Sequence, residues 1–156
     1  MEKIDFMLRA VELSRNSVES GKGGPFGCVI VKDGKIVGEG SNQVTSTNDP
    51  TAHAEIVAIR NACKNLDSFQ LDDCEVYTSC EPCPMCLGAI YWARPDKIYY
   101  ANTRNDAAII DFDDSLIYDE INEPIEKRKI KMESLGRDEA IKVFELWKSK
   151  TNKINY

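Results

Sequence analysis

The stretch Ser79–Cys86, SCEPCPMC, decides how the rest of the chain is interpreted. It spaces three cysteines evenly, at Cys80, Cys83 and Cys86. Clustered thiols indicate a metal site, and the C-x2-C-x2-C spacing is also the beginning of an iron–sulfur loop. Such a loop requires a fourth cysteine at position 90, which is Ile90 in this chain. The spacing therefore disfavours an iron–sulfur cluster, and the remaining ligand must come from another part of the sequence.

The single histidine of the chain is the best candidate for that ligand. His53 lies in Thr51–Ile56, TAHAEI, two residues before Glu55 and at the start of a predicted helix. An H-x-E motif followed by P-C-x-x-C is the signature of zinc-dependent deaminases. The match is complete here, because the second motif runs to Cys86. We therefore interpret His53, Cys83 and Cys86 as the ligands of one zinc ion.

This ligand set predicts a catalytic metal. One imidazole and two thiolates leave the fourth tetrahedral position open, whereas a structural zinc site is closed by four protein ligands. Water in that position becomes hydroxide near neutral pH and can attack a substrate. Side chains two residues apart on a helix point away from each other, so we expect Glu55 to carry protons and not to bind the metal. We interpret Cys80 as a packed thiol, with ligation by its sulfur as the alternative.

Periodicity and turn signals predict an alternation of helices and strands. The predicted helices are Met1–Ser20, Thr51–Cys63, Pro84–Ala93, Asp113–Ile121 and Arg137–Lys150. The predicted strands are the two arms of a hairpin over Cys28–Gly40, followed by Cys74–Ser79 and Lys97–Asn102. This order favours a three-layer α/β/α sandwich, with a sheet of four or five strands covered by helices on both faces. No linker or repeat divides the chain, so we expect one domain over residues 1–156.

The composition limits where the protein acts and what it binds. No apolar run is long enough to cross a bilayer, and the N-terminal residues lack the apolar stretch of a signal peptide, which predicts a cytoplasmic protein. Six cysteines in such a chain do not indicate a disulfide framework. The net charge is -6, and the basic cluster Glu126–Lys131 is flanked by glutamates and typical of a solvated surface. We therefore expect neither a nucleic-acid nor a membrane partner.

Two longer stretches resemble a known family. Asn48–Cys63, NDPTAHAEIVAIRNAC, and Tyr77–Ala101, YTSCEPCPMCLGAIYWARPDKIYYA, are similar to the branch of the cytidine/deoxycytidylate deaminase superfamily that holds guanine deaminases and tRNA adenosine deaminases. Phe112–Ile121, FDDSLIYDEI, and the terminal Tyr156 resemble the bacterial guanine deaminases in particular. The resemblance implies a mixed five-stranded sheet, one Zn2+ per chain, a homodimer, and hydrolysis of guanine to xanthine and ammonia.

The same resemblance implies four substrate contacts. Asn42 would bond the polar edge of the purine, although an asparagine at a strand end is equally typical of a turn. Phe26 would stack on the base, although by composition alone a phenylalanine at this position is more typical of a core aromatic residue. Asp114 would accept hydrogen bonds from guanine N–H groups, with Asp113 as the alternative or as a helix cap. Tyr156 would close over a site, which could be that of the neighbouring subunit through an exchanged C-terminal segment.

Three alternatives remain open from the sequence. The first is a tRNA wobble-adenosine deaminase, which shares the PCPMC motif but must grip an anticodon loop. The second is a deaminase of another small aminated nucleobase or nucleoside. The third is a metal-stabilised binding module, for which Glu55 would have no purpose. The chain also departs from the family at Cys28, where relatives commonly carry alanine, and this thiol is expected near the floor of the pocket.

Overall fold

The computed structural model describes residues 1–156. The chain divides into two compact units, Met1–Asp114 and Ser115–Tyr156, which are described in turn. The interpretation of the whole chain as one deaminase domain stays a prediction. Among the helices, none combines the length and the apolar character that a membrane span requires.

The first unit is built on a mixed sheet of four strands. These are β1 (Gly27–Lys32), β2 (Lys35–Ser41), β3 (Cys74–Cys80) and β4 (Lys97–Asn102), in the order β2-β1-β3-β4. Strand β1 is antiparallel to both of its neighbours, and β3 is parallel to β4. The expectation of five strands is therefore wrong by one. The residues after β4 form helices, turns and coil but no strand, so β4 is the last strand of the sheet.

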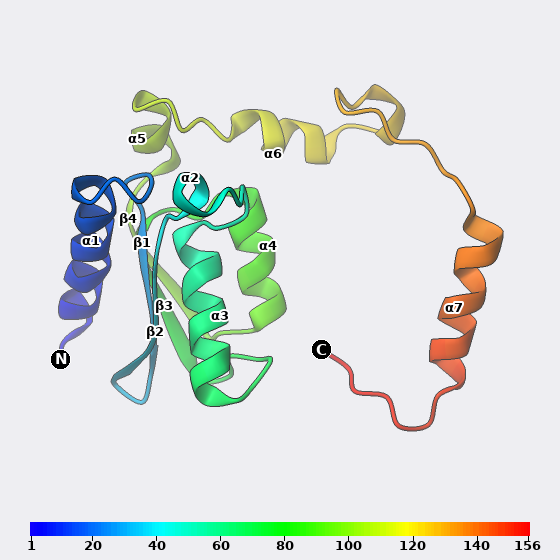
Figure 1. Ribbon diagram of the computed structural model, residues 1–156, viewed down its shortest axis with the longest axis horizontal. Helices are drawn as coiled ribbons and strands as arrows, with labels where there is room; N and C mark the ends of the chain where they lie inside the picture. The colour runs from blue at the N-terminus through cyan, green and yellow to red at the C-terminus, as the bar shows by residue number, and fades with distance from the viewer. The chain divides into compact units, whose positions relative to one another are not determined.

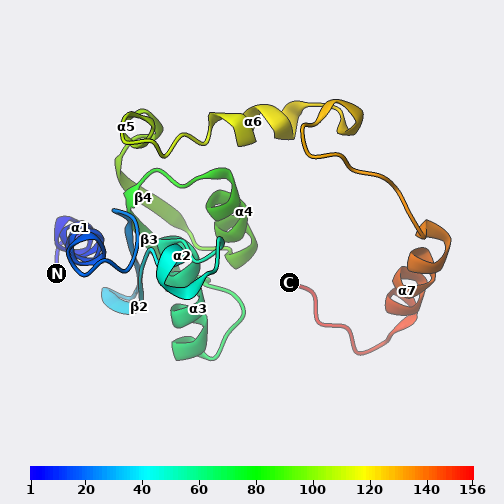
Figure 2. The same ribbon diagram turned by 45° about the horizontal axis from the view of Figure 1, so that its top comes forward.

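Helices cover both faces of this sheet, as the sequence predicts. Helix α1 (Lys3–Glu19) lies on one face, and helices α3 (Ala54–Leu66) and α4 (Pro84–Ala93) lie on the other (Figures 1 and 2). Successive residues of a strand point to opposite faces. Accordingly, Val29 and Val31 pack with Phe6 of α1, whereas Cys28 and Ile30 pack toward α3 and α4. The architecture is the three-layer α/β/α sandwich.

Glycines on β2 allow α3 to pack very closely against the sheet. A Cβ atom at Gly40 would lie 2.2 Å from the Ala54 carbonyl oxygen, and one at Gly38 would lie 2.6 Å from that of Ala58. Only glycine permits such an approach. The side-chain amide of Asn61 also donates to the Glu39 carbonyl at 2.9 Å, which ties the helix to the strand. These contacts fix the position of α3 and therefore of His53, which precedes its first residue.

Two short helices in the first unit do not follow from the sequence pattern. Helix α2 (Val44–Thr47) lies inside the segment that reads as a polar loop, and α5 (Arg104–Ile109) follows β4. Helix α2 ends at Asn48, which adopts a left-handed conformation with φ 52°. Four-residue helices leave almost no periodic signal, because one turn is too short to show a repeating apolar face.

The second unit contains α6 (Ser115–Asn122), the 3-10 turn η1 (Ile125–Lys127) and α7 (Arg137–Ser149). In the single chain no residue of this unit is buried. Its large apolar side chains are instead exposed, among them Leu116, Ile121, Leu135, Phe144 and Trp147. A segment with so much exposed apolar surface does not have a hydrophobic core of its own.

Candidate metal centre

The three predicted ligands come from the starts of two helices. His53 is the N-cap residue of α3, and Cys83 is the N-cap residue of α4, each with extended backbone (ψ 158° and 168°). Cys86 lies in the first turn of α4, and Pro84 occupies its first helical position, where a missing N–H is tolerated. The N-terminal ends of helices carry partial positive charge and favour thiolates. The local sequence therefore builds a site for anionic sulfur ligands.

The geometry of this group fits a tetrahedral zinc ion. His53 Nδ1 lies 3.6 Å from Cys83 Sγ and 3.5 Å from Cys86 Sγ. Zinc–sulfur bonds of about 2.3 Å and zinc–nitrogen bonds of about 2.0 Å, meeting at a tetrahedral angle, separate sulfur and nitrogen by about 3.5 Å. All three ligand atoms lie within 4.8 Å of one another. The spacing thus matches three corners of one zinc coordination sphere, with Nδ1 as the histidine ligand.

The Cys83 and Cys86 sulfurs also influence each other's pKa, and the anionic form that binds a metal is favoured at one of them. A hydrogen bond from the Cys86 thiol, opposed by burial and assisted by His53, lowers the pKa of Cys83 to about 4. The hydrogen bond to Cys83 and burial raise the pKa of Cys86 well above its ordinary value. One sulfur is thus already a thiolate at neutral pH, and metal binding releases the proton of the other.

Glu55 lies beside the sulfurs without belonging to the ligand group. Glu55 is only 6% exposed, and this burial raises the pKa of its carboxyl group above the ordinary value of 4.5. Its Oε1 is 3.1 Å from the Thr78 hydroxyl, and that hydroxyl is also 3.0 Å from the Cys80 carbonyl oxygen. A hydroxyl has one proton and can also accept. Thr78 therefore offers a partner to Glu55 in either protonation state, by donating to the carboxylate or by accepting from the carboxylic acid.

The other cysteines lie outside the ligand group. Cys80 is buried, and its Sγ is 3.7 Å from the Thr103 carbonyl oxygen, which matches its interpretation as a packed thiol. Cys28 is fully buried on β1, where burial and the charge of Glu55 raise its pKa. Cys28 is thus close enough to Glu55 to be affected by its charge, and its position at the floor of a pocket stays a prediction. All six cysteines of the chain are free thiols.

Asn42, the first of the predicted substrate contacts, is held rigidly. Its Oδ1 accepts from the backbone N–H groups of Gly24 (3.3 Å) and Val44 (3.2 Å), and its backbone oxygen accepts from Ser17 Oγ (3.1 Å). A Cβ atom at Gly23 would lie 2.2 Å from that same backbone oxygen, so only glycine fits there. Because the side-chain oxygen is already engaged by two donors, the amide nitrogen is the group that Asn42 can offer to a ligand.

Phe26 has an aromatic partner that sequence reasoning missed. The ring of Phe112 meets the ring of Phe26 edge to face, with centroids 4.9 Å apart and an interplanar angle of 89°. Both rings lie against Gly24, where a Cβ atom would approach each to 3.2 Å. The only sequence signal was the proximity of Phe112 to Asp114. This contact joins the Gly-rich loop to the segment that carries the predicted specificity carboxylate.

Asp114 and Tyr156, the remaining predicted contacts, lie in different units. The Asp114 side chain is 18% exposed and forms an ion pair with Arg104, with Nε 3.4 Å from Oδ1. Tyr156 is an exposed residue of the second unit. The first unit thus brings His53, Cys83, Cys86 and Glu55 together. The role of Tyr156 stays a prediction.

With this geometry established, comparison with known proteins defines the class. Residues 1–102 match the cytidine and deoxycytidylate deaminase zinc-binding region, and the chain belongs to this family of zinc deaminases. The family region accounts for zinc as the cofactor, and His53, Cys83 and Cys86 are the group in this chain that fits it.

Individual relatives are similar over nearly the whole chain. A guanine deaminase of Bacillus subtilis (strain 168) is 57% identical over 151 residues, which cover 97% of each protein. The X-ray structure of guanine deaminase from Bacillus subtilis superposes with a TM-score of 0.97 at 56% identity, covering 100% of this chain and 99% of that one. A tRNA-specific adenosine deaminase of Aquifex aeolicus (strain VF5) is 32% identical over 99% of each chain. A structure of guanine deaminase from Nitrosomonas europaea has a TM-score of 0.69 at 32% identity, covering 72% and 65% of the two chains.

Proposed function

We propose that the protein catalyses the zinc-dependent hydrolysis of guanine to xanthine and ammonia. The observation that carries this proposal is the group of His53, Cys83 and Cys86 with the buried carboxyl of Glu55 beside it. Three protein ligands with a neighbouring acid/base are the equipment of a hydrolytic zinc site. The choice of guanine rests on the likeness to the Bacillus subtilis guanine deaminase over nearly the full length of both chains.

Zinc supplies Lewis acidity, which lowers the pKa of water toward neutrality. The chain supplies the proton transfers. Glu55 accepts a proton from the attacking water and donates it to a ring nitrogen of the purine. Water oxygen bonds to the carbon that bears the amino group. Glu55 then takes the remaining proton of the new hydroxyl group and delivers it to the amino group, so that the carbon–nitrogen bond breaks, ammonia leaves and the hydroxyl oxygen becomes the carbonyl of xanthine. Thr78 remains bonded to Glu55 throughout this cycle, because its hydroxyl can donate or accept.

The proposed substrate contacts follow the chemistry of the purine edge. The Asn42 amide nitrogen donates to an acceptor on the ring, and Asp114 accepts from guanine N–H groups, which adenine does not present in the same pattern. Phe26 offers its ring to the flat base, supported by the edge of Phe112. We also propose that Tyr156 closes over a site, which in a dimer with exchanged C-terminal segments is that of the neighbouring subunit.

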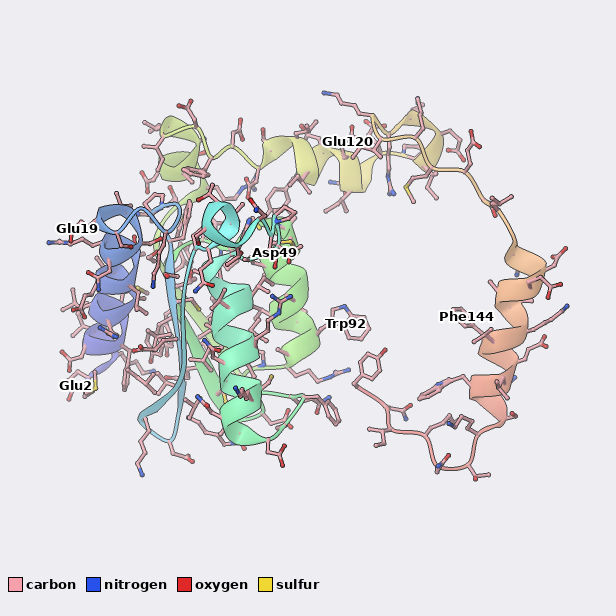
Figure 3. All side chains as sticks on the ribbon, in the orientation of Figure 1. Glu2, Glu19, Asp49, Trp92, Glu120 and Phe144 are labelled. Atoms are coloured by element: carbon pink, nitrogen blue, oxygen red, sulfur yellow. The ribbon has the colours of Figure 1, made fainter.

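We also propose a homodimer with exchanged C-terminal segments. Helix α4, PMCLGAIYWA, has no charged residue, and Tyr91 and Trp92 are exposed on it; Figure 3 shows Trp92 projecting from the helix away from the sheet. The second unit has no core of its own, and Phe144, for example, is 73% exposed. Surfaces this apolar support burial against a second copy.

Mixing two inactive variants tests the exchange. In a mixed dimer of Glu55→Gln and Tyr156→Ala chains, an exchanged segment would place an intact Tyr156 over the site that retains Glu55. Recovery of activity on mixing supports the exchange, and two variants that stay inactive together would exclude it. Light scattering gives the oligomeric state independently, with twice 17.6 kDa expected.

A tRNA wobble-adenosine deaminase is the second candidate, since the Aquifex aeolicus relative covers the whole chain. The net charge of -6 argues against a grip on an anticodon loop, because phosphate neutralisation supplies most of the affinity for RNA. Incubation of the protein with guanine, other aminated heterocycles and tRNA separates the candidates. Xanthine and ammonia from guanine are expected, whereas inosine in tRNA without xanthine would overturn the proposal.

We propose a cytoplasmic location and a small-molecule substrate without a nucleic-acid partner. All six cysteines are free, and a reducing compartment keeps the Cys83 and Cys86 thiolates available to the metal.

A further inference from the structure

Arg104 occupies a position that its surroundings fix firmly. It is the first residue of α5, whose start is set by a capping box between Thr103 and Asp106. In that box the Thr103 N–H donates to Asp106 Oδ2 at 2.8 Å, and the Asp106 N–H donates to Thr103 Oγ1 at 3.2 Å. Because these two hydrogen bonds fix the start of the helix, the backbone of Arg104 has little conformational freedom.

Two contacts of Arg104 connect separate parts of the site. Its backbone N–H donates to Glu81 Oε2 at 3.0 Å, and its side-chain Nε lies 3.4 Å from Asp114 Oδ1. Glu81 is two residues before the metal ligand Cys83, and its own N–H donates to the Asn102 carbonyl at 2.8 Å. A continuous set of hydrogen bonds and peptide bonds therefore runs from Cys83 through Glu81 and Arg104 to Asp114.

Arg104 also brings a positive charge into an acidic neighbourhood. Burial first, and then the charges of four carboxylates, raise the pKa of the Cys80 thiol to about 11. Those carboxylates are Glu55, Glu81, Asp106 and Asp114. The ion pair that Arg104 forms with Asp114 is only partly exposed, at 37% for the Arg104 side chain and 18% for that of Asp114.

We propose that Arg104 is a positioning residue that holds the Asp114 carboxylate at a fixed place relative to the metal centre, so that it can accept guanine N–H groups. This inference rests on the proposed deamination of guanine and adds a residue that determines substrate affinity. One carboxylate oxygen faces Arg104, and an ionised carboxylate has further lone pairs to offer a purine. Arg104 acts through Asp114 and does not touch the substrate.

Direct binding of guanine tests the proposal without requiring turnover. The measurement uses zinc-loaded full-length chain carrying Glu55→Gln, which prevents consumption of the ligand, and compares it with chains that carry Arg104→Gln, Asp114→Asn or both in addition. Arg104→Gln is expected to weaken guanine binding about 10-fold when Asp114 is present and less than about 2-fold in the D114N background. With Glu55 restored, Arg104→Gln should raise KM by a similar factor and leave kcat within about 3-fold.

Two matched variants complete the design. Arg104→Lys keeps the positive charge beside Asp114 and should recover most of the affinity. Arg9→Gln removes an arginine of similar exposure (34%). Arg9 lies on α1 and pairs with Glu39 on β2, and its replacement should leave guanine binding unchanged.

Either of two results would overturn the proposal: a loss below about 3-fold on Arg104→Gln, or equal losses with and without Asp114. Failure of the proposed function gives a different result, since the unaltered protein would then release no ammonia from guanine. In that event the same cycle is run with the heterocycle that the protein does deaminate, and the two criteria are unchanged.

Discussion

The two faces of the sheet place their carboxyl groups in different environments. On the α1 face, Tyr77 stacks on Tyr99 and donates to Glu75 at 2.6 Å, so that the network is closed within the protein. On the α3 and α4 face, the next residue, Thr78, supports Glu55, whose carboxyl is buried with a raised pKa beside two sulfur ligands. Burying an ionisable group in this way costs free energy. The face that bears this cost is the one equipped for chemistry.

The largest expected effect falls on the second of these faces. Glu55→Gln should lower kcat for guanine about 1000-fold or more, because the amide cannot transfer protons, while one zinc per chain and the fold are retained. Ammonia release, metal analysis and circular dichroism measure the three quantities. Normal turnover by this variant would show that another group carries the proton.

Thr78→Val should have the next largest effect. The change preserves shape but removes the hydroxyl that bonds Glu55 and the Cys80 carbonyl, so kcat should fall about 10-fold and unfolding should cost about 1–3 kcal/mol less. Thr78→Ser retains the hydroxyl and serves as the control, with kcat expected within about 3-fold of the unaltered protein. Equal kcat values for the valine and serine variants would show that the hydrogen bond from Thr78 to Glu55 does not support catalysis.

Phe112→Ala tests the aromatic support of the substrate site. Loss of an edge-to-face partner is worth about 0.5–1.5 kcal/mol, so KM for guanine should rise about 3- to 10-fold with little change in kcat. Steady-state kinetics measures the split. A fall in kcat with unchanged KM would mean that Phe112 acts on the metal centre instead of on Phe26.

The smallest effect is expected on the α1 face. Hydrogen bonds from Tyr77 and Lys3 lower the pKa of Glu75 below its ordinary value of 4.5. The carboxylate therefore contributes stability above pH 4.5, and this contribution is lost as the pH falls through the lower folded-state value. Since the side chain is 32% exposed, the contribution is below about 1 kcal/mol.

Replacement of that carboxyl separates the two faces experimentally. Glu75→Gln should reduce the loss of stability on acidification, as followed by thermal unfolding between pH 7 and pH 3, and should leave guanine turnover at neutral pH unchanged. A large change in turnover would mean that the α1 face takes part in the chemistry.

The comparison also explains what the sequence could predict. The metal ligands could be predicted because H-x-E and P-C-x-x-C are local motifs at helix starts. The helix after His53 also shows an apolar face at Ile56, Ile59 and Cys63, and Pro84 marks the start of the helix after Cys83. The three-layer order followed from the alternation of helices and strands. The order of predicted elements allowed four or five strands and the family resemblance implied five, but the chain after β4 forms no further strand.

The residues that were missed act through long-range contacts. Thr78 reads as an ordinary strand residue, and its role depends on Glu55, which lies 23 positions earlier in the chain. Arg104 begins the short helix α5, and Phe112 lies in the segment after it; both stretches are too short to show a repeating apolar face. Their partners, Phe26 and Asp114, are known only once the chain is folded.

X-ray absorption at the zinc edge of the purified protein tests the central claim most directly. The account predicts one zinc per chain with two sulfur neighbours at about 2.3 Å and two lighter neighbours, one of them imidazole nitrogen, at about 2.0–2.2 Å. Three or four sulfur neighbours, which would bring in Cys80 or another thiol, or a metal other than zinc, would contradict it.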